Sequence, residues 1–365
     1  MKLVMIGHGM VGHKFIEAIL EKADDELEIT ILAEEPRIAY DRVHLTEYFS
    51  GKSAKDLSLA RFDFADAHGI DLRLNTKAIA IDTKEQTVTT SMGDGISYDK
   101  LVLATGSYAF VPPIAGNDRE NCFVYRTIED LDAIRAASLN ATSGVVIGGG
   151  LLGLEAAKAL RDLNLETHVV EFASRLMAVQ IDDLGGKVLR RKIENLGVKV
   201  HTQKATQCIE AGNNAKHVMK FADGSELETD VILFSAGIRP RDELARSSGL
   251  ALGERGGIKI NDYCQTSDEN IYAIGECALW DNKIYGLVAP GYDMARIAAK
   301  HILAEETHCF AGADMSTKLK LMGVDVASVG DAHGMTPNSL SYFYADEDAL
   351  VYKKIVVDAD KTKLL

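Results

Sequence analysis

The sequence predicts an α/β fold, and three observations support this interpretation. An apolar run enters the pattern Gly-x-Gly-x-x-Gly twice, at residues 3–12 and 145–153. A helix-like segment and then a strand-like segment follow each copy. From residue 313 onward, apolar and polar residues alternate as in an antiparallel sheet. Together these patterns predict two Rossmann-like domains, the second inserted in the first, and a small α+β C-terminal domain.

Each glycine has its own role in the repeated pattern. The first permits the tight turn after a buried parallel strand, the second lets the backbone approach a pyrophosphate, and the third lets the next helix pack closely on the strand. The phosphates then bind free N–H groups at the helix N-terminus. The glycines are Gly7, Gly9 and Gly12 in the first copy and Gly148, Gly150 and Gly153 in the second. The sequence therefore predicts two dinucleotide sites.

The residues that follow each copy support this prediction. The expected helix, strand and acidic residue are 13–22, 28–32 and Glu34 after the first copy, and 154–163, 167–170 and Glu171 after the second. A carboxylate about 20 residues beyond the glycines accepts hydrogen bonds from a ribose. Because a carboxylate also repels a 2′-phosphate, Glu171 favours NADH over NADPH, although Arg175 could moderate this preference.

Further segments indicate where ligands would lie. The irregular stretch 38–49 predicts a loop over a ligand, with Arg42 available to a phosphate or a flavin ring edge; a surface ion pair is the alternative. The apolar run 271–274 ends at Gly275 and Glu276, at the strand end where open α/β sheets bind ligands. The other expected strands are 72–82, 86–91, 96–98, 101–107, 198–202, 215–221, 231–236, 318–321, 324–329, 341–345 and 350–357, and the other expected helices are 182–196, 291–304 and one capped by Thr127 within 122–137.

Composition and charge narrow the class of protein. The 365 residues are 47% hydrophobic and 26% charged, which is ordinary for a globular protein. The net charge of −14 argues against nucleic acid or anionic membrane partners. No stretch has the length of a membrane span or the form of a cleaved signal, so we expect a cytoplasmic protein. The five cysteines are scattered, and neither a redox pair nor a metal site is expected.

The chain resembles the two-dinucleotide-binding-domain flavoprotein disulfide reductases over residues 1 to about 310. The resemblance rests on both glycine patterns, on Ala104-Thr105-Gly106 after an apolar strand, and on the run 272–276. In that superfamily the first glycine pattern and the last motif hold FAD, and the second glycine pattern holds NAD(P)H. The last motif ordinarily ends Gly-Asp. Here Glu276 keeps the charge but has a longer side chain.

A closer resemblance, to the amino-terminal part of the large subunit of NAD(P)H-dependent nitrite reductase, covers nearly the whole chain. The matching runs are 34–37, 39–43, 124–131, 148–157, 287–292, 318–321 and 330–334. The later iron–sulfur and siroheme cysteine clusters of that family are absent from this sequence. The resemblance therefore implies an electron-entry fragment or a stand-alone relative, which cannot itself reduce nitrite.

The resemblance also implies domains and site residues. It implies an FAD-binding domain at 1–112 and 241–312, an NAD(H)-binding domain at 113–240, and at 313–365 either an interface-like domain or an incomplete platform for further domains. The implied FAD contacts are Gly7, Gly9, Met10, Val11, Gly12, Glu34, Arg42, Ala78, Thr105, Gly106, Glu276 and Pro290. The implied NAD contacts are Gly148, Gly150, Leu151, Leu152, Gly153, Glu155, Glu171 and Gly237.

The implied function is oxidation of NADH through FAD, with electrons passing to an acceptor protein or to downstream iron–sulfur and siroheme domains. The paired redox cysteine of disulfide reductases would lie within residues 38–50, which contain no cysteine. No catalytic acid or base is predicted, because hydride transfer depends on orientation. The alternatives are a stand-alone NADH:rubredoxin or ferredoxin-type reductase, a flavoprotein sensor with little turnover, and an NADH oxidase or peroxidase, which would need a reactive cysteine. A homodimer is a further hypothesis.

Overall fold

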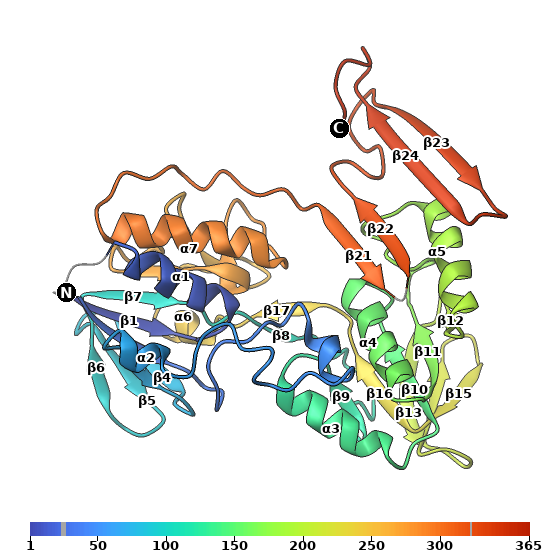
Figure 1. Ribbon diagram of the computed structural model, residues 1–365, viewed down its shortest axis with the longest axis horizontal. Coiled ribbons are helices and arrows are strands. Elements are labelled where there is room, and N and C mark those ends of the chain that lie inside the picture. Colours follow the sequence, from blue (N-terminus) through green and yellow to red (C-terminus); the bar gives the residue numbers. More distant parts are fainter. Residues whose placement is uncertain (23–26, 322) are drawn as a thin grey trace. The chain divides into compact units, whose positions relative to one another are not determined.

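The computed structural model describes residues 1–22, 27–321 and 323–365, which form two compact units (Figure 1). Unit 1 consists of Met1–His44, Ser53–Tyr108 and Ile238–Ala313. Unit 2 consists of Leu45–Lys52, Ala109–Gly237 and Asp314–Leu365. Unit 2 thus contains the second glycine pattern and also the C-terminal segment.

A five-stranded sheet in the order β19-β7-β1-β2-β3 forms the centre of unit 1, and every pair in it is parallel. The strands are β1 Lys2–Ile6, β2 Glu28–Leu32, β3 Asp71–Arg73, β7 Lys100–Leu103 and β19 Ile271–Ala273. After its first residue, the central strand β1 is apolar and buried, because both faces of the sheet are covered. Helices α1 (Met10–Leu20) and α7 (Val288–Ile302) lie side by side against this sheet (Figure 1).

Unit 2 repeats this arrangement with a parallel sheet in the order β12-β11-β10-β16-β9. The strands are β9 Cys122–Val124, β10 Ser143–Ile147, β11 Glu166–Val170, β12 Lys199–His201 and β16 Val231–Phe234. Its helices are α3 Ile128–Ser138, α4 Leu151–Asp162 and α5 Asp183–Asn195. The apolar run before the second glycine pattern is β10, at the centre of the sheet and fully buried at Val145 and Val146.

Smaller elements complete the two units. Antiparallel three-stranded sheets are formed by β4 Ala78–Asp82, β5 Thr87–Thr90 and β6 Gly95–Ser97, and by β13 Thr206–Ala211, β14 His217–Phe221 and β15 Glu226–Thr229. The remaining elements up to residue 302 are η1 Leu45–Tyr48, α2 Phe64–Ala67, β8 Ser107–Ala109, β17 Ile238–Pro240, α6 Glu243–Ser247, β18 Ile258–Lys259, η2 Gly275–Cys277 and β20 Ala278–Leu279.

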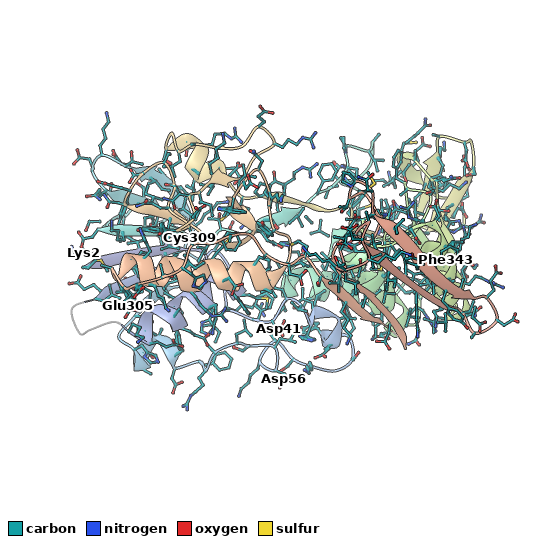
Figure 2. All side chains as sticks on the ribbon, turned by 90° about the horizontal axis from the view of Figure 1, so that it is seen from above. Lys2, Asp41, Asp56, Glu305, Cys309 and Phe343 are labelled. Carbon is teal, nitrogen blue, oxygen red and sulfur yellow. The ribbon has the colours of Figure 1, made fainter. Side chains whose placement is uncertain are left out.

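The C-terminal segment forms two separate antiparallel hairpins instead of one sheet. The first pairs β21 (Thr317–Leu321) with β22 (Val324–Ser328), and the second pairs β23 (Leu340–Asp346) with β24 (Val351–Val357). Strand β24 lies against α5, while the outer strand β23 carries the exposed Phe343 (Figure 2). We expected strands in these places, but their grouping depends on what each hairpin packs against.

The structure differs from the local predictions in three respects. The expected strand 72–82 is divided into β3 and β4, because Asn75 adopts a left-handed φ of 52° in the turn between them. Several strands, among them β9, β13 and β15, were not predicted. Helix α7 begins before Gly291 and includes Pro290, which a first helical turn tolerates because its N–H groups have no partner within the helix.

The capped helix was predicted correctly and allows a test of local stability. Thr127 is the N-cap of α3: its hydroxyl accepts from the Asp130 N–H, and the Asp130 carboxylate accepts from the Thr127 N–H. We expect Thr127→Ala to lower the free energy of unfolding by about 1 kcal/mol. Urea denaturation would measure the change. Thr127→Ser keeps the hydroxyl and should be near wild type; equal losses in both variants would contradict the capping role.

Candidate functional site

Both glycine loops have the same steric pattern. Gly7 has a φ of +103° and Gly148 one of +120°, and a Cβ on either would lie within 2.3 Å of the carbonyl oxygen of Ala104 or 2.2 Å of that of Ser235. A Cβ on Gly12 or Gly153 would meet the first glycine's own carbonyl oxygen, at 2.6 Å and 2.0 Å. A Cβ on either middle glycine, Gly9 or Gly150, would meet no atom of the described residues within 4 Å beyond its chain neighbours and its own helix backbone. The loops are thus crowded by backbone on one side and open on the other.

The open side of each loop is the N-terminus of a helix. Gly9 is the N-cap of α1 and Gly150 that of α4, and neither helix has a side-chain cap or an acidic residue in its first turn. The first N–H groups of a helix have no partner within it and carry partial positive charge. Each loop therefore offers N–H donors and close backbone access to an anion, as a dinucleotide pyrophosphate requires.

In unit 1 the acidic residue after β2 lies near the turn that follows β7. Glu34 forms ion pairs with Lys77 at 3.1 Å and with Arg241 at 2.8 Å. The Arg241 N–H donates to the Gly106 carbonyl, and the Thr105 hydroxyl donates to the Arg241 carbonyl. Burial opposes the charge of Glu34, but Arg241 and Lys77 outweigh it and lower its pKa. Glu34 is thus ionised beside the predicted residues Thr105 and Gly106.

Arg42 is held by its neighbours in the sequence. It pairs with the Glu35 carboxylate, which also accepts from the Tyr40 hydroxyl at 2.8 Å, and its guanidinium lies 4.8 Å from the centre of the Tyr40 ring. Burial disfavours its charge, but interactions with Tyr40, Glu35 and Glu276 raise its pKa. The backbone N–H of Arg42 donates to the Met10 sulfur at 3.4 Å. Arg42 thus forms a partly buried ion pair with Glu35, and its contact with Met10 brings it to the glycine loop.

The carboxylate of Glu276 is also fixed in position. Ser107 donates its hydroxyl to Glu276 Oε2 at 2.6 Å. The neighbouring Gly275 lies against the side chain of Val11, as does Gly291, where a Cβ would approach Val11 Cγ2 to 2.5 Å. The turn after β19 and the start of α7 at Pro290 therefore pack directly on the first glycine loop.

Most of the residues predicted to bind FAD thus gather at one end of the unit 1 sheet. Ala78 is buried on β4 and directly follows Lys77, which pairs with Glu34. Sequence reasoning missed Glu35, Lys77, Ser107 and Arg241. Glu35 and Ser107 directly follow predicted residues or motifs, so their positions were the available signal.

In unit 2 the carboxylate of Glu171 lies against the second glycine loop. Its Oε2 accepts from the Gly149 N–H at 2.5 Å and its Oε1 from the Ala173 N–H at 2.7 Å. Arg175 points elsewhere: it donates to the Ile181 carbonyl and pairs with Asp183 at 2.7 Å. The cation that could have moderated the charge of Glu171 is therefore engaged at the start of α5.

The remaining predicted NAD contacts lie around this loop. Leu151, Leu152 and Glu155 are in the first turns of α4, which begins at the loop. Gly237 follows β16 two residues after Ser235, whose carbonyl contacts Gly148, and has a φ of +108°. The second set of predicted residues is thus gathered within unit 2.

All five cysteines are free thiols. Cys277 adjoins Glu276, but it is fully buried and donates to the Leu103 and Ile274 carbonyls. Burial raises its pKa, which disfavours the reactive thiolate. Within the described ranges, no group of three or more metal-ligating side chains occurs, and no helix is long and apolar enough to cross a membrane.

Comparison with known proteins gives three informative matches. Residues 1–301 match the pyridine nucleotide-disulphide oxidoreductase family. The Escherichia coli protein "Nitrite reductase (NADH) large subunit" is 56% identical over 100% of this chain and 43% of its own length. The Alcanivorax borkumensis "Rubredoxin-NAD(+) reductase" is 31% identical over 85% of this chain and 81% of its own length. The chain spans less than half the length of the nitrite reductase subunit.

Solved structures agree with the fold. The NAD-dependent persulfide reductase from A. fulgidus superposes with a TM-score of 0.90 and 26% sequence identity, over 100% of this chain and 73% of its own.

His8, in the first glycine loop, predicts a pH dependence of stability. Its side chain is buried, and within the described structure neither ring nitrogen has a hydrogen-bond partner. Burial, and then the nearby His13, lower its pKa from 6.5 to about 4. Below pH 6.5 the unfolded chain binds a proton that folded His8 does not, so stability is lost as the pH falls toward about 4.

We expect His8 to contribute a loss of about 2 kcal/mol between about pH 7 and about pH 5. Urea unfolding of wild type and His8→Gln at both pH values measures this contribution as the difference between their losses. His44→Gln, at an exposed histidine, serves as the control. An equal loss in wild type and His8→Gln would show that His8 does not contribute.

Proposed function

The chain belongs to the pyridine nucleotide-disulphide oxidoreductase family, and from this premise we propose that it is an electron-entry module that oxidises NADH through FAD and passes electrons to a separate acceptor. The observation that carries the proposal is the pair of glycine loops, which share one steric pattern and each open onto an uncapped helix N-terminus. Two such loops call for two dinucleotides.

Unit 1 supplies groups that fit FAD. The N–H groups at the start of α1 would bind the pyrophosphate, with Gly9 leaving room for its approach. Arg241 and Lys77 lower the pKa of Glu34 and so favour its carboxylate, which would accept hydrogen bonds from the ribose hydroxyls. Arg42 and Glu276, fixed by Glu35 and Ser107, would present one positive and one negative group to the rest of the cofactor.

Unit 2 supplies groups that fit NADH. The start of α4 would bind the pyrophosphate, and Glu171, already oriented by two backbone N–H groups, would accept the hydroxyls of the adenosine ribose. Arg175 would not compensate a 2′-phosphate at this point, because its guanidinium is bound to Ile181 and Asp183. These contacts support the preference for NADH over NADPH.

FAD, when bound, accepts hydride from NADH and can release the electrons singly to an acceptor. The residues of this chain would bind and orient the two dinucleotides. We propose that no cysteine thiol takes part in this electron transfer. Cys277 is buried and its pKa is raised, and residues 38–50 contain no cysteine. This argues against a disulfide reductase, oxidase or peroxidase reaction that depends on a thiolate near the flavin.

The acceptor is proposed from the relatives. One is named a nitrite reductase large subunit and another a rubredoxin reductase, so iron–sulfur and siroheme domains, or a small iron protein, are the acceptors we propose. The alternative function, a nucleotide sensor with little turnover, is less favoured because a sensor needs only one of the two glycine sites. The cytoplasmic location and the homodimer stay predictions.

A visible spectrum tests the proposed function. We expect the purified chain, reconstituted with FAD, to show a flavin band that bleaches anaerobically with one equivalent of NADH and returns on addition of ferricyanide. Bleaching with negligible turnover on any acceptor would favour the sensor. A protein that retains no flavin after incubation with FAD would contradict the proposal.

The role of Glu171 is tested by nucleotide preference. We expect Glu171→Ala to weaken NADH binding and to lower the NADH to NADPH ratio of kcat/KM by about tenfold or more, because a ribose acceptor and a repulsive charge are lost together. Glu166→Ala removes a carboxylate from the same strand, where it pairs with Lys199 and His168, and serves as the control. An unchanged ratio in Glu171→Ala would contradict the assignment.

A further inference from the structure

Residues 171–182 connect the proposed ribose carboxylate to the start of α5, and their first half forms part of the glycine loop. Met177 donates its N–H to the Gly149 carbonyl at 2.9 Å, while Glu171 accepts from the Gly149 N–H. The Leu176 side chain packs so closely that a Cβ on Gly149 would lie 2.6 Å from its Cδ2. The conformation of this connection therefore shapes the proposed nucleotide site.

The second half of the same connection is held by the C-terminal segment. Ser328, at the end of β22, donates its hydroxyl to the Gln180 carbonyl at 2.7 Å. His333 approaches the Val179 carbonyl with Nε2 at 2.9 Å, which makes this nitrogen the donor. Two side chains from the far end of the sequence thus bind consecutive carbonyl groups of the connection.

A third contact is made at the N-cap of α5. Tyr352, on β24, donates its hydroxyl to Asp182 Oδ2 at 2.6 Å, and Lys354 lies 3.1 Å from the same oxygen. The other carboxylate oxygen of Asp182 accepts from the Gly185 N–H and so caps the helix. The Tyr352 ring also packs on Gly185, where a Cβ would lie 3.1 Å from its Cδ1. The ribbon drawing shows β22 and β24 on the same side of the unit as α5 (Figure 1).

We propose that Ser328, His333 and Tyr352 form a C-terminal clamp that sets the affinity of the chain for NADH by holding residues 178–182 in place. They are positioning residues and touch no nucleotide in this proposal, which rests on the proposed function of unit 2. The physical basis is conformational selection: if a free protein holds the competent loop for only a fraction of the time, the apparent affinity falls by that fraction.

The contribution of the clamp is partial, because the connection also holds itself together. Arg175 donates to the Ala178 and Ile181 carbonyls and pairs with Asp183, and Ile181 donates its N–H to the Met177 carbonyl. Loss of the clamp should therefore loosen the loop without unfolding it. We expect NADH affinity to fall by several-fold and not to vanish.

The test compares two triple variants of the full chain loaded with FAD. Ser328→Ala/His333→Ala/Tyr352→Phe removes the clamp. Ser316→Ala/His308→Ala/Tyr344→Phe makes the same chemical changes away from the clamp, at the exposed His308 and Tyr344 and at Ser316, whose hydroxyl donates to its neighbour Asp314. We expect the clamp variant, but not the control, to raise the NADH Kd and KM about fivefold, with kcat unchanged at saturation. Hydrogen exchange in 172–182 should be faster in the clamp variant.

Two further measurements separate positioning from general damage. Flavin content and melting temperature report whether the clamp variant is folded; if the triple variant is not, Tyr352→Phe against Tyr344→Phe gives the same comparison. His333→Gln retains a side-chain N–H donor and should restore affinity that His333→Ala loses. Equal NADH affinity in folded clamp and control variants would overturn the clamp and leave the proposed function standing. Failure of the flavin-loaded wild type to bind NADH would overturn both.

Discussion

The close approach of two backbone segments at each glycine loop is the constraint on which both candidate sites depend. In unit 1 the loop packs on the Ala104 carbonyl, just past β7, and in unit 2 on the Ser235 carbonyl, just past β16. Strands β7 and β16 occupy equivalent positions, each paired in parallel with the strand that enters the loop. A side chain at the first glycine would push the loop away from this neighbour. The helix behind it could then not present its N–H groups to a phosphate.

Three carboxylates lie near the first glycine loop in unit 1, and each has a hydrogen-bonding or ion-pair partner. Glu34 pairs with Arg241 and Lys77, and Glu35 pairs with Arg42 and accepts from the Tyr40 hydroxyl. Glu276 accepts from the Ser107 hydroxyl. An unpaired carboxylate beside an anion site would oppose the binding of a phosphate, whereas paired carboxylates hold their neighbours in fixed positions. The longer side chain of Glu276 is accommodated because the Ser107 hydroxyl fixes its end.

Within unit 2, the C-terminal segment contacts the connection between Glu171 and helix α5. Ser328, His333 and Tyr352 therefore hold a loop that lies far from them in the sequence. The outer strand β23 pairs with β24 and leaves Tyr344 and Phe343 exposed.

The sequence by itself determined the two parallel sheets, the glycine loops and the capped helix. The glycine loops, the strands that enter them and the capped helix each depend on residues close together along the chain: apolar runs before Gly7 and Gly148, and the pair Thr127 and Asp130. Tertiary structure alone decided the partners of Arg42, Glu34 and Arg175, because several opposite charges or carbonyls lie within reach of each and burial selects among them. It also decided how the C-terminal strands group, since alternation marks a strand but does not specify which surface covers its apolar face.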